Sequence, residues 1–408
     1  MNKSGERPAR SSAGGDAKVI DMELVIVGGG PAGLSTALHL QAIAPRLAER
    51  MIVLEAERYP REKICAGGLG MRGLAALEKL GVTLDVPMVP LDAVGVRLAS
   101  ETIVTRVPRC GVVVRRAEFD HALARAAIAR GIDVRDATPV TAIDVRADHV
   151  VVTAATATYR AKAIVGADGV GGIVRRAAGF ARHELRAQVC ELDTEASPLD
   201  LPRDTVVFDF AMRDLAGYAW DFPTLVASEP LVCRGAYAIH NLAHDSPRAR
   251  LETYLAARGL DIGRYRLKQF AERGFAPGAP IARPRVLLVG EAAGIDIATG
   301  EGIAQAIEYG ATAGPYLARA FERDDLGFAN WRRYVARHHI GWQMRIRHLC
   351  YRWFYGDRRD TVERIMPKLP QLFRVGVEDF AGLPISKLAL AHGAGQFLAA
   401  YIHERARD

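Results

Sequence analysis

Residues 23–40 read ELVIVGGGPAGLSTALHL, an apolar strand that runs through a glycine-rich turn into a helix. Such a corner points several backbone N–H groups and the positive end of the helix at one spot, which suits a diphosphate. The first glycine permits the tight turn, the second lets a phosphate approach the backbone, and the third lets helix and strand pack closely. We therefore predict a dinucleotide-binding turn formed by Gly28, Gly30, Pro31, Ala32 and Gly33.

A second strand, predicted over residues 51–55, completes the first strand–helix–strand unit. It ends at Glu55, 22 residues after Gly33, where a carboxylate can accept hydrogen bonds from ribose hydroxyls. Ala56 follows at the same edge of the sheet. A lone glycine motif would be a weak signal, but here a strand, a helix and an acidic residue surround it in the expected order.

The rest of the chain continues this pattern with one interruption. We predict a strand at 112–114, a helix from Arg116 to Gly131, a small antiparallel meander from strands at Val134, 140–145 and 150–153, and a parallel strand at 163–166. Residues 182–273 hold more aromatic residues and proline, which indicates an inserted substrate-facing sheet. A buried strand returns at 286–290, a helix follows over about 302–321, and the remainder is mainly helical.

The predicted fold class is α/β, a dinucleotide-binding parallel sheet flanked by helices, with an inserted antiparallel-sheet substrate domain and a C-terminal helical region. We predict that residues 1–20 form a disordered tail. The dinucleotide-binding domain is expected at 21–90, 110–181 and 274–325, and the substrate domain at 91–109 and 182–273. The helical region is expected at 326–408.

Composition narrows the class of protein. Half of the 408 residues are apolar and a quarter are charged, as in a folded globular chain. The net charge of +7 comes mostly from scattered arginines, which suits an anionic cofactor or substrate or reflects a genome rich in arginine codons. No basic block or motif indicates a nucleic-acid partner.

Five dispersed cysteines without a CxxC pair indicate a reduced, cytoplasmic protein without a metal site. The first twenty residues lack the apolar core of a signal peptide. No apolar run reaches the roughly 18–20 residues of a spanning helix, so we expect any membrane contact to be peripheral.

Four further segments, in this order along the chain, separate FAD from NAD as the tightly held dinucleotide. They are PREKICAGGL at 60–69, GADG at 166–169, YAWDFP at 218–223, and VGEAAG at 289–294 with TGEGI at 299–303. Together they resemble the geranylgeranyl reductase family, within the wider superfamily of aromatic hydroxylases and flavin-dependent halogenases. The resemblance covers about residues 22–320, and the cysteine-containing and YxWxFP segments are its most diagnostic parts.

The resemblance implies FAD as cofactor and a role for several positions. Arg116 resembles the arginine that lies along the FAD, Val140 the residue whose backbone meets adenine, and Asp168 an aspartate that supports both FAD and a nicotinamide donor. Glu291 stands where the family usually has aspartate, with Gly290 before it, so its contact to the cofactor is shifted by one methylene. The other implied cofactor contacts are Cys65, Ala66, Gly67, Gly300, Gly302 and Ile303.

Two of these segments suggest more than cofactor binding. A helix N-terminus at Gly300 and Gly302 would stabilise negative charge on a reduced flavin. In similar reductases the cysteine loop lies over the flavin face, so Cys65 is the catalytic candidate; an isolated cysteine is more often inert core. Tyr218, Trp220 and Phe222 alternate on one strand face that ends at Pro223, which predicts an apolar substrate wall or simple core packing.

Residues 331–359 interleave aromatic residues with arginine and histidine. A cationic amphipathic helix of this kind can lie on an anionic membrane, although packing on its own domain is the more common outcome.

The leading hypothesis is reduction of a carbon–carbon double bond in a lipophilic, isoprenoid or polyketide-like substrate, with hydride from reduced flavin. No second nicotinamide-binding unit is found, so NAD(P)H or another reductant must dock transiently. The alternatives are a flavin monooxygenase or halogenase and a flavoprotein that relays electrons to a quinone. The YxWxFP segment replaces the halogenase WxWxIP, and residues 67–76 hold no counterpart of the catalytic halogenase lysine.

Overall fold

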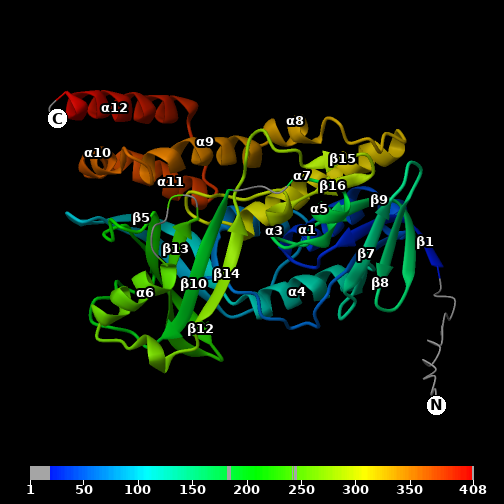
Figure 1. Cartoon of the computed structure of the whole chain (residues 1–408), viewed down its shortest axis with the longest axis horizontal. Coiled ribbons are helices and arrows are strands. Elements are labelled where there is room, and N and C mark those ends of the chain that lie inside the picture. Colours follow the sequence, from blue (N-terminus) through cyan, green and yellow to red (C-terminus); the bar gives the residue numbers. More distant parts are fainter. Residues whose placement is uncertain (1–18, 182–184, 241, 243–245, 407–408) are drawn as a thin grey trace, which may run out of the picture.

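The computed structural model of this chain describes residues 19–181, 185–240, 242 and 246–406. Within them the strands form two eight-stranded sheets, A and B, which lie toward opposite ends of the long axis (Figure 1).

Sheet A holds the dinucleotide-binding unit predicted from the sequence. Its main path runs β15 (Ala282–Arg283), β16 (Val286–Leu288), β9 (Thr158–Gly166), β1 (Val19–Val27), β2 (Met51–Leu54) and β6 (Asp133–Arg135). All neighbours from β16 to β6 are parallel. The strands β7 (Val140–Val145) and β8 (Val150–Ala154) continue antiparallel from β9. This confirms the α/β fold class with a parallel sheet.

Two details of the predicted elements differ. The strand around Val134 does not join the antiparallel meander, because β6 extends the parallel sheet beside β2; its three residues are too few for the alternation of side chains to reveal the partner strand. The predicted tail is too long, because Val19 and Ile20 already pair with β9 in β1. Residues 1–18 lie outside the described residues.

Sheet B is the inserted sheet, and it is mainly antiparallel. Its order is β14 (Lys268–Arg273), β10 (Arg186–Thr194), β13 (Glu229–Ile239), β12 (Gly217–Val226), β11 (Thr205–Asp209), β4 (Met88–Arg97), β5 (Thr102–Val114) and β3 (Gly68–Gly70). The one parallel pair is β11 with β4. The sheet therefore extends past the predicted 91–109 segment and takes in residues 68–70 next to the cysteine loop.

Two long helices pack together beside sheet A, α1 (Pro31–Ile43) and α7 (Ile303–Glu322). Gly310 of α7 faces Ser35 of α1, where an added Cβ would come within 2.4 Å of the Ser35 hydroxyl oxygen. The Ser35 hydroxyl donates a hydrogen bond to the Ile307 carbonyl at 2.7 Å. This close approach aligns the N-terminal ends of both helices toward the predicted cofactor. The other elements of this lobe are α2 (Pro45–Ala48), α3 (Met71–Glu78), α4 (Arg116–Ala129), α5 (Ile173–Ala177) and the 3-10 turn η2 (Gly290–Ala292).

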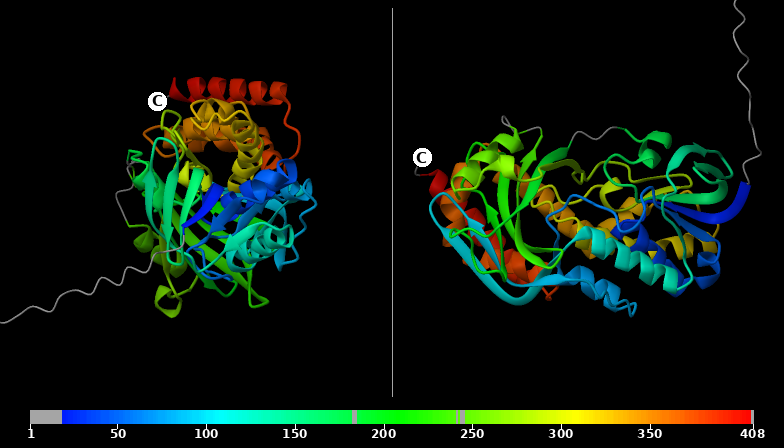
Figure 2. Two further views of the ribbon diagram at one scale, coloured as in Figure 1. Left: turned by 90° about the vertical axis from the view of Figure 1, so that its right-hand side faces the viewer. Right: turned by 90° about the horizontal axis from the view of Figure 1, so that it is seen from below.

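The chain ends in a layer of helices, as predicted, but residues 331–359 do not form a single helix. The layer contains α8 (Trp331–Ala336), α9 (His339–Phe354), α10 (Arg359–Ile365), η3 (Met366–Lys368), α11 (Pro370–Phe380) and α12 (Lys387–Arg405). In Figure 1 α10 and α11 lie between sheet B and α12, and the left view of Figure 2 also shows α12, in red, at the outer edge. No helix among the described residues is long and apolar enough to cross a membrane.

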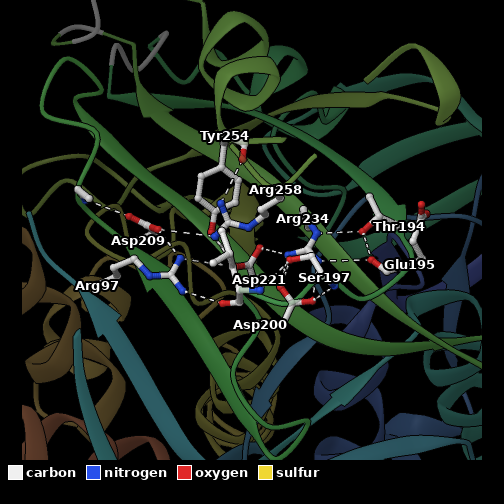
Figure 3. A network of polar contacts seen from close by, with 12 residues as sticks. Arg97, Thr194, Glu195, Ser197, Asp200, Asp209, Asp221, Arg234, Tyr254 and Arg258 are labelled. Carbon is white, nitrogen blue, oxygen red and sulfur yellow. Dashed lines mark hydrogen bonds and ion pairs between the residues drawn. The ribbon is translucent and has the colours of Figure 1, made fainter. Parts of the chain in front are cut away.

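The two faces of sheet B differ in chemistry. On one face Arg234, fully buried, binds Asp221 at 2.5 Å and Asp200 at 2.7 Å, and Asp221 also accepts hydrogen bonds from Tyr254 and Arg258 (Figure 3). Tyr254 belongs to α6 (Pro247–Ala256) and Arg258 follows it, so this network holds the helix on the sheet; η1 (Ile262–Arg264) comes next. The other face is aromatic and looks toward the C-terminal helices.

Candidate active site

The glycine turn has the geometry that a diphosphate needs. Gly28 has φ of +108°, and its N–H donates to the Leu54 carbonyl at 2.8 Å. A Cβ on Gly33 would lie 2.0 Å from the Gly28 carbonyl oxygen, so the helix can approach the turn only without a side chain there. No side chain caps the start of α1 at Gly30. Its first N–H groups are therefore free to bind an anion.

Glu55 lies beside this turn, as predicted. Its Oε2 accepts a hydrogen bond from the Gly29 N–H at 2.9 Å and pairs with Arg61 Nε at 3.3 Å. The Thr138 N–H donates to the Glu55 carbonyl at 2.8 Å, which brings the start of β7, with Val140, to the same edge of sheet A. The predicted ribose and adenine positions are thus neighbours, and Ala56 is exposed next to them.

Two arginines approach the open side of Gly30. A Cβ on Gly30 would lie 3.5 Å from Arg61 Nη2 and 3.9 Å from Arg116 Nη2. Arg116 is held by two hydrogen bonds of 2.7 Å to Asp120, and Arg61 lies 3.1 Å from the same carboxylate. The sequence predicted Arg116 but not Arg61, although Arg61 belongs to the PREKICAGGL segment. These residues fit the diphosphate of FAD, because two cations and an open helix start converge on one glycine.

Asp168 and Glu291 lie farther along the predicted cofactor path. Asp168 accepts a hydrogen bond from the Val174 N–H at 2.9 Å near the start of α5, and burial raises the pKa of its carboxyl. Glu291 Oε1 is buried and has no hydrogen-bond partner among the described residues, and its Oε2 is 3.9 Å from Lys63 Nζ. At Gly290, with φ of +58°, an added Cβ would lie 2.5 Å from Ala32 Cβ. The second glycine motif therefore contacts the first.

The loop before α7 is fixed by side chains from three directions. The buried Asp296 accepts hydrogen bonds from the Ala298 N–H at 2.8 Å and from Arg347 of α9 at 2.6 Å. Tyr237 donates to the Ile297 carbonyl at 3.0 Å, and Tyr355 donates to the Ala298 carbonyl at 2.6 Å. Side chains of the protein itself therefore hold this loop in place.

The same loop presents an open helix start. Gly300 has φ of +66°, where glycine is the favoured residue. Gly302 precedes Ile303, the first residue of α7, and no side chain caps the helix. The N–H groups at this end are therefore open to a ligand, and their contact with a flavin ring stays a prediction.

Cys65 lies in a loop that is hydrogen-bonded to sheet B through Glu191. Its N–H donates to Glu191 Oε1 at 3.0 Å, and its Sγ accepts a hydrogen bond from the Gly67 N–H at 3.4 Å. Burial raises the pKa of the Cys65 thiol and raises the pKa of Glu191 to about 7. Cys65, Ala66 and Gly67 all line a cavity of about 1460 Å³ between the cysteine loop, sheet B and the C-terminal helices. The thiol is therefore placed at the site but held in its protonated form.

The predicted aromatic wall exists. Tyr218, Trp220 and Phe222 of β12 face one apolar cluster and line the same cavity. The Tyr218 hydroxyl donates to the Thr299 carbonyl, so this wall joins the loop before α7, which we call the flavin loop. Pro223 is buried behind it and is not among the residues that line the cavity.

The C-terminal helices form the opposite wall, which the sequence did not predict. Trp342 and Trp353 of α9, Phe380 of α11 and Phe397 of α12 line the cavity together with the flavin loop and the cysteine loop. Trp331, by contrast, is fully buried, and its indole donates to the Leu288 carbonyl at 3.1 Å. The aromatic residues of 331–359 thus divide between core packing and the cavity.

Comparison with known proteins agrees with this geometry. Residues 21–216 match the family model of the FAD binding domain. The chain is 25% identical over 352 residues to digeranylgeranylglycerophospholipid reductase 2 of Methanosphaera stadtmanae, a match that covers 79% of this chain and 85% of that protein. A geranylgeranyl bacteriochlorophyll reductase-like protein from Thermoplasma acidophilum has a similar structure, with a TM-score of 0.68 at 20% identity over 95% of this chain and 99% of that one.

A flavin-dependent brominase is also similar in structure, with a TM-score of 0.70 at 17% identity over 95% of this chain and all of that one. The fold therefore does not separate reduction from halogenation. The domain match and the relatives define the class of this protein: it is an FAD-dependent oxidoreductase. Within that class it is similar to proteins named as geranylgeranyl reductases or geranylgeranyl reductase-like.

Proposed function

We propose that this enzyme reduces a carbon–carbon double bond of a lipophilic substrate, isoprenoid or polyketide-like. The cavity carries the proposal, because it is lined mainly by aromatic and aliphatic side chains and extends from the cysteine and flavin loops to α12. A long apolar chain fits this volume, and the relative named digeranylgeranylglycerophospholipid reductase 2 supports a substrate of that chemistry.

Bound and reduced FAD would supply the hydride, and the protein would supply position and a dry pocket. Gly28, Gly30 and the two arginines would hold the diphosphate, Glu55 the ribose, and the α7 helix start the edge of the ring. NAD(P)H, or another reductant that docks transiently, would deliver the electrons.

The cavity favours reduction over halogenation. The described residues that line it include no lysine, the residue type that the halogenase alternative requires. Lys63 lies over the ring of Phe270 at 5.3 Å from its centroid and pairs with Glu291. These two contacts hold Lys63 beside the predicted cofactor path.

Turnover without oxygen tests the proposal. Dithionite-reduced enzyme would be mixed anaerobically with digeranylgeranylglycerophospholipid, and saturated product would be measured by mass spectrometry. Product formed without oxygen is expected. Strict dependence on oxygen with hydroxylated or halogenated product would establish the monooxygenase or halogenase alternative. Reoxidation of the flavin by a quinone, with every alkene unchanged, would establish the electron relay.

We further propose that the substrate enters from a membrane surface contacted by residues 331–359. Trp342, Ile346 and Leu349 of α9 are exposed although they also line the cavity, and the exposed Arg345 and Arg352 lie among them. An apolar rim flanked by cations suits an anionic bilayer.

The double variant I346E/L349E should lose co-sedimentation with phosphatidylglycerol vesicles, whereas L199E, at an exposed leucine outside the C-terminal helices, should keep it. Equal sedimentation of all three proteins would refute membrane contact here.

A further inference from the structure

Glu272 is a partly buried acid that has no role in the function proposed above. It lies on β14 and lines the cavity. Its Oε2 is shielded from solvent, with neither a hydrogen bond nor an ion pair to any described residue. Buried polar atoms normally have hydrogen-bond partners, so a carboxyl oxygen without one at a cavity is a candidate to contact a bound ligand.

The position of Glu272 is next to the flavin loop. Its Oε2 lies 3.3 Å from the point that a Cβ on Gly300 would occupy. The Tyr218 hydroxyl and the Tyr237 ring lie 3.2 Å and 3.1 Å from the same point. The carboxyl group therefore lies where the aromatic wall meets the predicted edge of the flavin.

The surroundings of Glu272 favour the protonated form of its carboxyl group. Burial raises the pKa of the Glu272 carboxyl well above its usual range, and the nearby carboxylates of Glu291, Asp296 and Glu191 raise it further. Lys63 opposes them only in part. Tyr218 and Tyr237 also face this carboxyl, and burial raises the pKa of both phenols, so they stay neutral.

We propose that Glu272 is the proton donor of the reaction. This inference rests on the proposed function. One alkene carbon gains a hydride from the reduced flavin, which is oxidised, and the neighbouring carbon gains the proton that leaves the Glu272 carboxyl group. The Glu272 carboxylate then regains a proton from water, and the balanced result is one saturated carbon–carbon bond.

Two other groups are less suited to this step. Glu191 is not among the residues that line the cavity, and its Oε1 accepts the N–H of Cys65, so it positions the cysteine loop. Cys65 lines the cavity, but burial raises the pKa of a thiol that is already a weaker acid than a carboxyl group. A carboxylic acid that stays protonated near neutral pH is the better matched general acid.

The first test measures the reaction in two halves. Glu272→Gln keeps the shape of the side chain and removes the acid, so reduction of its FAD by dithionite should match wild type. Anaerobic reoxidation by digeranylgeranylglycerophospholipid should be about 10²–10⁴-fold slower. Glu272→Asp should be intermediate, and Glu252→Gln, at an exposed glutamate of α6, should be unchanged. Reoxidation of Glu272→Gln at the wild-type rate would overturn the proposal.

The second test needs neither substrate nor turnover. Wild-type holoenzyme should show infrared carbonyl bands of protonated carboxylic acids near neutral pH, and one of these bands should be lost in Glu272→Gln but kept in Glu252→Gln. A Glu272→Gln spectrum that keeps every wild-type band, or a wild-type protein without such bands, would refute the proposed protonation state. Because this reading is independent of any alkene, a wrong Glu272 assignment is distinguishable from a wrong proposed function.

Discussion

Replacing Gly33 by alanine tests the cofactor turn with a single methyl group. The Cβ would lie 2.0 Å from the Gly28 carbonyl oxygen, whereas ordinary contact begins at 3.4 Å. The difference, 3.4 − 2.0 = 1.4 Å, must be taken up by backbone, because the atom in the way is a main-chain oxygen. The turn and the start of α1 would move apart by about this distance.

The expected loss follows from the N–H groups in that turn. A shift of this size removes hydrogen bonds from the turn to the diphosphate, and a hydrogen bond to a charged group contributes about 1.5–3 kcal/mol. Loss of two such bonds costs about 3–6 kcal/mol, which weakens FAD binding by roughly 10²–10⁴-fold.

FAD titration of deflavinated protein, followed by flavin fluorescence, measures this affinity. The matched control is Gly395→Ala, since Gly395 is also helical but an added Cβ there meets nothing within 4 Å. Circular dichroism would check that both variants fold. A Gly33→Ala protein that binds FAD within about threefold of wild type would refute the assigned role of the turn, since even one lost hydrogen bond predicts a larger effect.

Three further predictions concern stability and reactivity. Arg234→Met should lower the free energy of unfolding, measured in urea, by about 3–5 kcal/mol because it leaves the Asp200 carboxylate without its arginine and leaves Asp221 with Arg258 alone at close range; a loss below about 1 kcal/mol would contradict this. Hydrogen bonds to Asp379 and Glu308 raise the pKa of His339 to about 9, so its stabilisation is complete below the unfolded pKa of about 6.5 and is lost as pH rises through about 9. The stability deficit of His339→Gln should thus be larger near pH 6 than near pH 10, and about 1–2 kcal/mol at most because the imidazole is nearly half exposed; a deficit that grows with pH would show the opposite linkage. Because burial raises the pKa of the Cys65 thiol, iodoacetamide should label Cys65 slowly in native protein near neutral pH and rapidly after unfolding; fast native labelling by mass spectrometry would indicate a thiolate.

The cofactor half of the site was largely predictable because its residues follow one another at short, fixed spacings. Gly28, Gly33 and Glu55 lie within one strand–helix–strand unit, so local periodicity places them relative to each other. The alternation of Tyr218, Trp220 and Phe222 likewise revealed their common face. Their detailed roles in binding FAD and substrate stay predictions.

The positions of Arg61 and Glu272 in the site could not be predicted from sequence patterns. Arg61 reaches Gly30 only because the loop after β2 folds back over the turn, and Glu272 meets Gly300 only because β14 pairs with β10 at the edge of sheet B. Neither residue has a partner at a recognisable spacing, and a lone glutamate on a strand is ordinarily a surface residue.

The sequence by itself determined the α/β class, the dinucleotide turn and the aromatic strand, because each depends on contacts between residues near in the chain. Tertiary structure alone decided that α9, α11 and α12 close the cavity opposite sheet B, and that an acid without a partner lies beside the flavin loop. Contacts between separate strands, loops and helices depend on how the layers pack, and local sequence patterns carry no record of that packing.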